Sequence, residues 1–395
     1  MKSITIVGAG MGPATVSRQG WEAIRQADML LGACRLLQSF SSGDKPTCAE
    51  YTPDGVRMAV ESTPAERFVV LVSGDTGFYS AAEKLGAALS EFSVAFIPGI
   101  SSLSYFFARM KKSWQDAALV SCHGREANFV DTVRRHKLTF ALTGSNVREM
   151  AAQLVTAGYG HLSVTVGANL GSDDERLDEY TASSLAEAGK EGLCVLLVEN
   201  PYSDPRVRTG IPDEEFIRGD VPMTKAEIRS VSMSLLAVAP DDICGDIGAG
   251  TGSVTVEMAL AAYRGRVYAI EPNENAVRLV RENTAAFHIG NVTVIPESAP
   301  DALASLPALS VAFIGGSGGR IREIIAALFR NNAGVRIVLN AITLETLHEA
   351  LEAFKAQGVD ADVVQISASR ARPAGNSHLM TALNPIYIIS GGGHA

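Results

Sequence analysis

The sequence predicts an α/β protein of two successive domains, and three observations carry this prediction. Short runs rich in β-branched residues alternate with longer stretches of helical spacing, the pattern of parallel sheets covered by helices. Glycine-rich turns follow several of these runs directly. Residues 199–220 then interrupt the alternation with three prolines and charges of both signs, which is typical of a linker between domains.

The expected elements of the first domain, residues 1–203, begin with a strand over Ser3–Val7 that enters a glycine-rich turn. Helical spacing follows over Gly20–Asp28 and again over Ser101–Met110. Other short apolar runs predict strands at Phe68–Val72, Val94–Ile97, Leu119–Ser121, Thr139–Leu142, Ser163–Gly167 and Leu193–Val198.

The second domain, residues 204–395, is expected to begin with a helix over Lys225–Ala237. Strands are predicted after it at Ile243–Ile247, Val267–Ile270, Val292–Ile295, Leu309–Ile314, Arg336–Asn340, Val363–Ala368 and Asn384–Ser390. Because no long helix separates the last two, we expect them to pair as an antiparallel hairpin at the sheet edge.

Composition and charge exclude several classes of protein. A chain with 47% hydrophobic and 19% charged residues is not intrinsically disordered. A net charge of −9 argues against nucleic acid as a partner, because Lys and Arg drive phosphate binding. We find no secretory leader, no apolar run long enough to span a bilayer, and neither paired cysteines nor metal-ligand spacing among the histidines. We therefore expect a reduced cytoplasmic enzyme without a membrane partner or a bound metal.

The most specific motif is a glycine-rich turn after the strand expected at Ile243–Ile247. It reads D-x-G-x-G-x-G from Asp246 to Gly252, and Glu271 follows about 25 residues later at the tip of the next strand. Glycines there let the backbone approach a ligand, and the acid can accept hydrogen bonds from ribose hydroxyls. A NAD-binding Rossmann unit and a turn without any ligand are the alternatives.

This combination resembles the class I S-adenosylmethionine (SAM) methyltransferases, which implies a Rossmann-like fold for the second domain. The resemblance implies SAM contacts at Thr224, Gly248, Ala249, Gly250, Thr251, Gly252, Glu271 and Ala299. The Asn/Asp-Pro-Pro-Tyr/Phe motif of amine methyltransferases is missing after the fourth strand, so methylation of a nucleic-acid base is disfavoured.

A second glycine-rich loop, Gly315–Gly319, stands where that motif would be. Successive amides free of Cβ can form a nest that binds a carboxylate. Arginines cluster nearby in this acidic chain at 320, 322, 370 and 372. We expect Gly315, Gly316, Gly318, Gly319, Arg320 and Arg370 to contact an anionic substrate, and Ser317, Asn340 and His378 are the catalytic candidates beside it.

Three turns of the first domain each follow a strand-like run, namely Gly8–Pro13, Ser73–Ser80 and Ile97–Ser102. They could therefore line one cleft at the carboxyl ends of the strands. Together they resemble the tetrapyrrole methylase family, a different SAM-binding fold of two α/β lobes. The resemblance implies SAM contacts at Gly74, Asp75, Thr76, Tyr79, Ser101 and Ser102, and tetrapyrrole contacts at Gly10 and Arg125.

Across the whole chain, the order of the two domains resembles the decarboxylating corrin methyltransferases of cobalamin biosynthesis. The resemblance implies one SAM per domain and a polycarboxylate corrin substrate, precorrin-6Y or its cobalt form. Methylation at C-5 would occur in residues 1–203, and methylation at C-15 with loss of the C-12 acetate carboxyl in residues 204–395.

Related families assemble as dimers or tetramers, so we expect a homo-oligomer. A NAD-dependent oxidoreductase, a non-enzymatic SAM-binding protein and an RNA methyltransferase remain alternatives.

Overall fold

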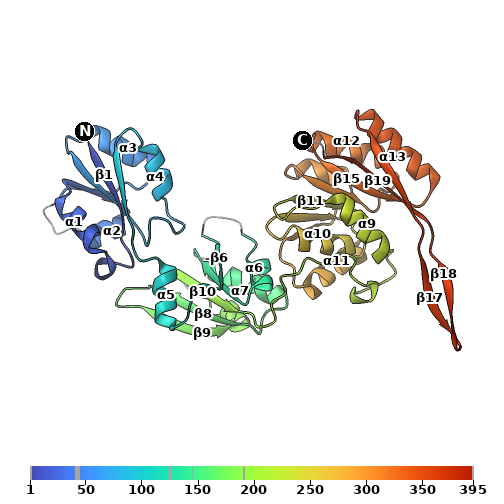
Figure 1. Cartoon of the computed structure of the whole chain (residues 1–395), viewed down its shortest axis with the longest axis horizontal. Helices are drawn as coiled ribbons and strands as arrows, with labels where there is room; N and C mark the ends of the chain where they lie inside the picture. Colours follow the sequence, from blue (N-terminus) through green and yellow to red (C-terminus); the bar gives the residue numbers. More distant parts are fainter. Residues whose placement is uncertain (1, 41–44, 124–126, 145, 190–191, 394–395) are drawn as a thin grey trace. The chain divides into compact units, whose positions relative to one another are not determined.

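The computed structural model describes residues 2–40, 45–123, 127–144, 146–189 and 192–393 (Figure 1). Contacts divide the chain into two compact units: residues 1–125, 138–148 and 163–199 form the first, and residues 126–137, 149–162 and 200–395 form the second. The predicted α/β class is confirmed, because helices accompany every large sheet. None of the described helices combines the length and apolarity needed to cross a bilayer.

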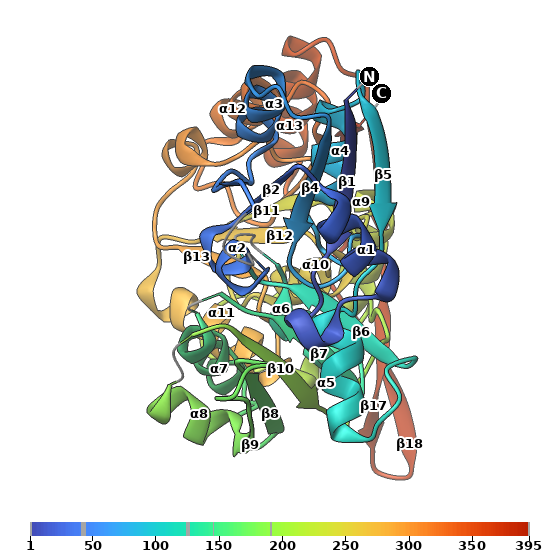
Figure 2. The ribbon, with the colours of Figure 1, turned by 90° about the vertical axis from the view of Figure 1, so that its left-hand side faces the viewer.

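The first sheet is parallel, with the strand order β3-β2-β4-β1-β5. Figure 2 shows β4, β1 and β5 side by side. The inner strand β1 buries Ile4, Ile6 and Val7 completely, as expected for a strand covered on both faces. The elements are β1 (Ser3–Gly8), β2 (Met29–Gly32), β3 (Thr47–Cys48), β4 (Arg67–Val72), β5 (Ser93–Ile97), the 3-10 turn Pro13–Thr15, α1 (Arg18–Gln26), α2 (Cys34–Phe40), α3 (Pro53–Ser62) and α4 (Ala82–Ala88).

The second sheet is mixed and has the order β6-β7-β10-β8-β9, with only β6 and β7 parallel. Strand β9 (Arg176–Thr181) was not expected, because its sequence RLDEYT is largely polar and it lies at the sheet edge. The remaining elements are β6 (Ala117–Ser121), β7 (Leu138–Leu142), β8 (Ser163–Ala168), β10 (Cys194–Glu199), α5 (Ser102–Met110), α6 (Phe129–Arg135), α7 (Val147–Thr156) and α8 (Ala182–Ala188).

The sheet of the second unit has the order β13-β12-β11-β14-β15-β19-β16. Its first five strands are parallel, and the chain proceeds outward from β11 in both directions, so the carboxyl ends of β11 and β14 form a topological switch point. The elements are β11 (Ile243–Ile247), β12 (Arg266–Ile270), β13 (Val292–Ile295), β14 (Val311–Ile314), β15 (Arg336–Ala341), α9 (Ala226–Leu236), α10 (Ser253–Ala261), α11 (Glu274–Ala286), α12 (Ile321–Asn331), α13 (Leu344–Ala356) and 3-10 turns at Asp213–Glu215 and Asp301–Ser305.

The expected antiparallel pair at the edge of this sheet is confirmed by β16 (Ala361–Ile366) and β19 (Ile386–Gly392). Between them the chain forms a separate two-stranded hairpin, β17 (Ser369–Ala374) and β18 (Ser377–Ala382), which the sequence pattern did not predict. Figure 1 shows it extending beyond the seven-stranded sheet. Most of its residues are exposed, so its sequence lacks the alternation of apolar and polar residues that marks a half-buried strand.

Buried charges order the chain that enters the second unit. Arg229 on α9 is fully buried, and its Nε donates to Glu257 Oε1 at 2.8 Å while Nη1 donates to Asp213 Oδ1 at 3.2 Å. The same guanidinium also donates to the carbonyl oxygens of Ile211 and Thr224. One buried side chain thus holds the entering segment against α9 and α10, and Thr224 belongs to the wall of the cavity described next.

Candidate functional site

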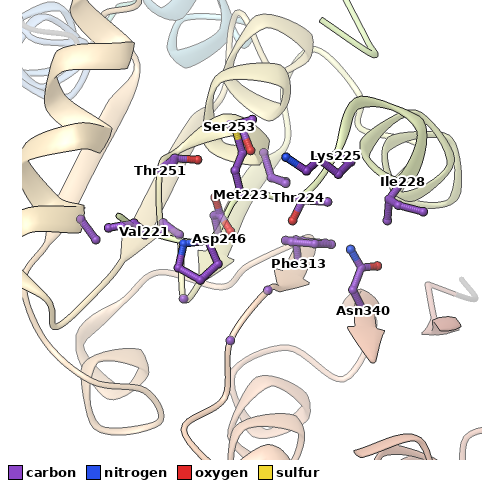
Figure 3. A pocket seen from close by; sticks show the side chains of 18 of the residues that line it. Val221, Met223, Thr224, Lys225, Ile228, Asp246, Thr251, Ser253, Phe313 and Asn340 are labelled. Atoms are coloured by element: carbon purple, nitrogen blue, oxygen red, sulfur yellow. The ribbon is translucent and has the colours of Figure 1, made fainter. Parts of the chain in front are cut away.

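A cavity of about 770 Å³ lies in the second unit at the carboxyl ends of its parallel strands (Figure 3). Ligands of open α/β sheets bind at this edge. The cavity brings together many residues that the sequence singled out: Thr224, Gly248, Ala249, Gly250, Thr251, Glu271, Gly315, Gly316, Gly318 and Asn340.

The two glycine-rich loops touch at the base of this cavity. Gly248 and Gly250 have φ values of +69° and +57°, in the left-handed region that favours glycine. A Cβ on Gly248 would lie 2.5 to 2.7 Å from backbone atoms of Gly316. The contact therefore explains why glycine is needed at Gly248 on grounds of space as well as conformation.

Glu271 fixes the first glycine loop. Its side chain follows β12, only 8% of the residue is exposed, and its two oxygens accept from Gly250 N at 3.0 Å and from Asn273 N at 2.9 Å. Each carboxylate oxygen has a second lone pair, so the group can still accept hydrogen bonds from a ligand in the cavity.

Asp246 is a second buried acid in the cavity, at the end of β11. Its Oδ2 accepts from the Thr255 hydroxyl, whereas its buried Oδ1 has no hydrogen-bond partner within the described part of the chain. Burial raises the pKa of Asp246 to about 7, a rise that the Thr255 hydrogen bond opposes and the charge of Glu271 increases. The sequence places Asp246 in the glycine loop expected beside the methionine moiety of SAM, but its individual contact with the ligand was not predicted.

Lys225 was also missed. It stands at the N-terminal end of α9, lines the cavity, and its Nζ lies 3.6 Å from Asp213 Oδ2. The available signal was its position directly after Thr224, which the sequence did single out.

The two arginines expected to contact substrate do not line the cavity. Arg320 pairs with Glu323 at 2.6 Å and with Asp301 at 3.0 Å. Arg370 pairs with Glu227 at 2.7 Å across from β17. Acidic neighbours thus engage both guanidinium groups, and their contact with substrate remains a prediction.

Five other predicted residues also lie outside the cavity lining. They are Gly252, which caps α10; Ala299, packed beside the sheet core; Ser317 and Gly319, in the second glycine loop; and His378, exposed on β18.

In the first unit, the three predicted loops converge. A Cβ on Gly8 would lie 2.5 Å from Gly99 N and 2.8 Å from Gly74 O. Gly10 and Gly74 exchange two backbone hydrogen bonds of 3.0 Å. Asp75 accepts from Gly99 N at 3.1 Å through Oδ2, so its carboxylate ties the loop after β4 to the loop after β5.

The other predicted contacts of the first unit are more dispersed. Tyr79 is about half exposed and its hydroxyl donates to Leu119 O at 3.3 Å, while Ser101 caps α5 by accepting from Ser104 N. Thr76 follows Asp75 in its loop, and Ser102 is the first residue of α5. Arg125 lies outside the described residues. A cavity of about 380 Å³ in this unit is lined by residues 14–17 and 98–100. Residues 98–100 belong to the turn that was expected to border the SAM cleft, whereas residues 14–17 were not predicted.

Comparison with known proteins matches each half of the chain to a family. The family model of tetrapyrrole (corrin/porphyrin) methylases matches residues 3–186, and that of the precorrin methyltransferase domain matches residues 215–391. A probable cobalt-precorrin-6B C(15)-methyltransferase (decarboxylating) from Pyrobaculum calidifontis is 44% identical over 48% of this chain and 97% of its own length.

One relative spans both halves. A precorrin-6Y C(5,15)-methyltransferase [decarboxylating] from Sinorhizobium sp. is 29% identical over 97% of this chain and 94% of its own length. The crystal structure of precorrin-6Y C5,15-methyltransferase from Geobacter metallireducens GS-15 is 37% identical, with a TM-score of 0.44, and covers 46% of this chain and 95% of that chain. The chain therefore belongs to the family of decarboxylating precorrin-6Y C5,15-methyltransferases, which joins a tetrapyrrole methylase to a precorrin methyltransferase.

Proposed function

We propose that the chain methylates a late corrin precursor, precorrin-6Y or its cobalt form, at C-5 and C-15 and removes the carboxyl group of its C-12 acetate side chain. Methyltransferases of this family use SAM as the methyl donor. We assign one SAM to each unit, with C-5 methylation in the first and C-15 methylation with decarboxylation in the second. The cavity with two glycine loops and two buried acids carries the proposal for the second unit.

The residues of this cavity fit SAM, which when bound supplies an electrophilic methyl group. The unpartnered Oδ1 of Asp246 suits its ammonium group, and the spare lone pairs of Glu271 suit its ribose hydroxyls. Gly250 keeps the loop free of a side chain where the backbone must approach the ligand. The contribution of the chain is to hold the reacting carbon in line with the methyl group and to exclude water.

The charged groups of the cavity fit two ligands of opposite charge. Asp246 and Glu271 belong to the end formed by β11 and β12, where a sulfonium cation would be stabilised. Lys225 at α9 supplies a positive charge for a substrate carboxylate. In the second glycine loop, Gly315 N and Gly316 N already donate to Ile247 O and Gly319 N to Ser317 Oγ, so the amides of Ser317 and Gly318 are the ones that can donate to another carboxylate. Because Lys225 lines the cavity and Arg320 and Arg370 do not, Lys225 is the stronger candidate for the anchor.

Family membership favours methyl transfer over a NAD-dependent oxidoreductase, and a direct assay tests it. The full chain is incubated with SAM and either precorrin-6Y or its cobalt form, and the product is analysed by mass spectrometry. We expect two methyl groups gained and one CO₂ lost. A chain that binds SAM without changing either substrate would favour the non-enzymatic alternative.

A cytoplasmic location and a dimeric or tetrameric assembly remain predictions from the sequence.

The pKa of Asp246 predicts a pH dependence in the second unit. Because the pKa is raised to about 7, the carboxylate is mostly neutral at pH 5 and gains its charge as the pH rises through 7. If the ionised form binds the ammonium group of SAM, kcat/KM for SAM in CO₂ release should rise about ninefold from pH 5 to pH 6 and about fivefold from pH 6 to pH 7.

The matched variant for this measurement is Asp246→Asn, which still accepts from Thr255 but cannot ionise. Its kcat/KM for SAM should be low, and it should lack the rise between pH 5 and pH 7 that ionisation of Asp246 causes in the wild type. An equal slope in the variant would assign the pH dependence to another group.

A further inference from the structure

A hydrogen bond from a buried helix sets the orientation of Asn340. Ser232 on α9 is fully buried, and its hydroxyl donates to Asn340 Oδ1 at 3.2 Å. Asn340 lies near the end of β15, and its side chain faces the cavity. Because the hydroxyl holds the amide oxygen on the Ser232 side, the amide nitrogen of Asn340 points away from Ser232.

The amide nitrogen of Asn340 is available to a ligand. Within the described ranges, the one hydrogen bond of the Asn340 side chain is the bond that its Oδ1 accepts from Ser232, and Nδ2 forms none. Figure 3 shows this nitrogen on the side toward Phe313 and Thr224, with the amide oxygen turned away from them. Asn340 therefore offers the cavity hydrogen-bond donors only.

The strand order places this donor away from the acids of the cavity. Asp246 ends β11, Glu271 follows β12, and β14 separates β11 from β15. At roughly 4.8 Å between neighbouring strands, β15 lies about 10 Å from β11. The donor is thus separate from the acids proposed to hold the ammonium and ribose groups of SAM, and an acceptor oxygen of the second ligand suits this position.

We propose that Asn340 Nδ2 donates to a carboxylate of the methyl-acceptor substrate, and that Ser232 is the positioning residue that holds the amide in this orientation. The inference rests on the proposed function and deepens it, because it names a residue of α9 that does not itself line the cavity. Without the Ser232 hydroxyl, the amide can rotate and present its oxygen, which repels a carboxylate.

The first test compares Ser232→Ala with Ser230→Ala in the full chain. Ser230 is on the same helix, but its hydroxyl donates to Ala226 O within that helix. We expect Ser232→Ala to raise KM for the corrin substrate roughly three- to tenfold, the range for a weakened hydrogen bond to a charged group. KM for SAM should stay within about twofold, and Ser230→Ala should match the wild type in both constants. Equal KM values for the two variants would overturn the proposal.

Two variants of Asn340 separate positioning from a purely structural role. Asn340→Asp keeps an oxygen for the Ser232 hydroxyl but turns a negative oxygen toward the substrate, so it should raise KM for the corrin more than Asn340→Ala does. In a chain that already carries Asn340→Ala, Ser232→Ala should raise KM for the corrin by less than about twofold, because Ser232 acts only through the Asn340 amide. A wild-type KM in Asn340→Asp, or an undiminished Ser232→Ala effect in the double variant, would overturn the proposal.

The wild-type chain in the same assay separates this inference from the proposed function. If the wild type neither methylates the corrin nor releases CO₂, the proposed function fails. If the wild type is active and the variants fail to show the expected pattern, only the carboxylate contact of Asn340 and the role of Ser232 are overturned.

Discussion

Replacing Gly250 with valine is expected to abolish SAM binding in the second unit while leaving the first unit unaffected. Gly250 has a φ of +57°, where a β-branched residue is strongly disfavoured. An added Cβ would lie 3.2 Å from Pro222 O and 3.6 Å from Val221 Cγ1, both in the cavity wall. The loop would have to move, and the hydrogen bond from Gly250 N to Glu271 would be disturbed.

Titration calorimetry of the full chain measures this effect as a stoichiometry. We expect two molecules of SAM per wild-type chain and one per Gly250→Val chain. Gly358→Val is the matched control, because Gly358 has a φ of +71° and open space around it outside the cavity. Gly358→Val introduces similar backbone strain, and this variant should still bind two molecules of SAM. Two intact sites in Gly250→Val would refute the assignment of this loop.

Replacing Arg229 with methionine is expected to destabilise the second unit strongly. The change removes the ion-pair partner of the buried Glu257 and one of the three cations beside Asp213. Breaking a buried ion pair by removing one partner costs about 3–5 kcal/mol. The carbonyls of Ile211 and Thr224 also lose their donor, so the cavity wall should loosen as well.

Thermal and denaturant unfolding test this prediction against Arg264→Met. Arg264 also forms an ion pair, with Asp241, but both side chains are more than half exposed. Exposed pairs contribute little to stability, so this control should unfold close to the wild type. A midpoint for Arg229→Met no lower than that of Arg264→Met would show that the buried cluster contributes little net stability.

Most strands with a buried face were predicted from the sequence, but β2 was not, although three of its four residues are buried. The mostly exposed strand β16 was predicted from its apolar residues. The inner strands β1 and β11 are followed directly by glycine turns, which is a local signal. The polar edge strand β9 and the hairpin β17–β18 are exposed, so no hydrophobic period marked them.

The same distinction applies to the site. Gly250 and Glu271 were predictable because motif and spacing encode their positions along the chain. The contact of Ser232 was not, because its partner Asn340 lies 108 residues away in the sequence. Lys225 is only 12 residues from Asp213, but its place in the cavity depends on how the entering segment packs against α9. Arg370 was expected beside the substrate from charge alone, but folding brings it to Glu227 on α9.

The division of chemistry between the two units is the central claim, and complementation tests it most directly. Gly250→Val inactivates the proposed second site, and Gly74→Val is designed to inactivate the first, because Gly74 has a φ of +68° in the loop beside Gly10. Each variant alone should fail to yield the doubly methylated, decarboxylated corrin, and Gly250→Val alone should release no CO₂. An equimolar mixture of the two chains should restore that product by mass spectrometry, whichever methylation comes first. CO₂ release by Gly250→Val alone, or a mixture that forms no doubly methylated product, would contradict the account.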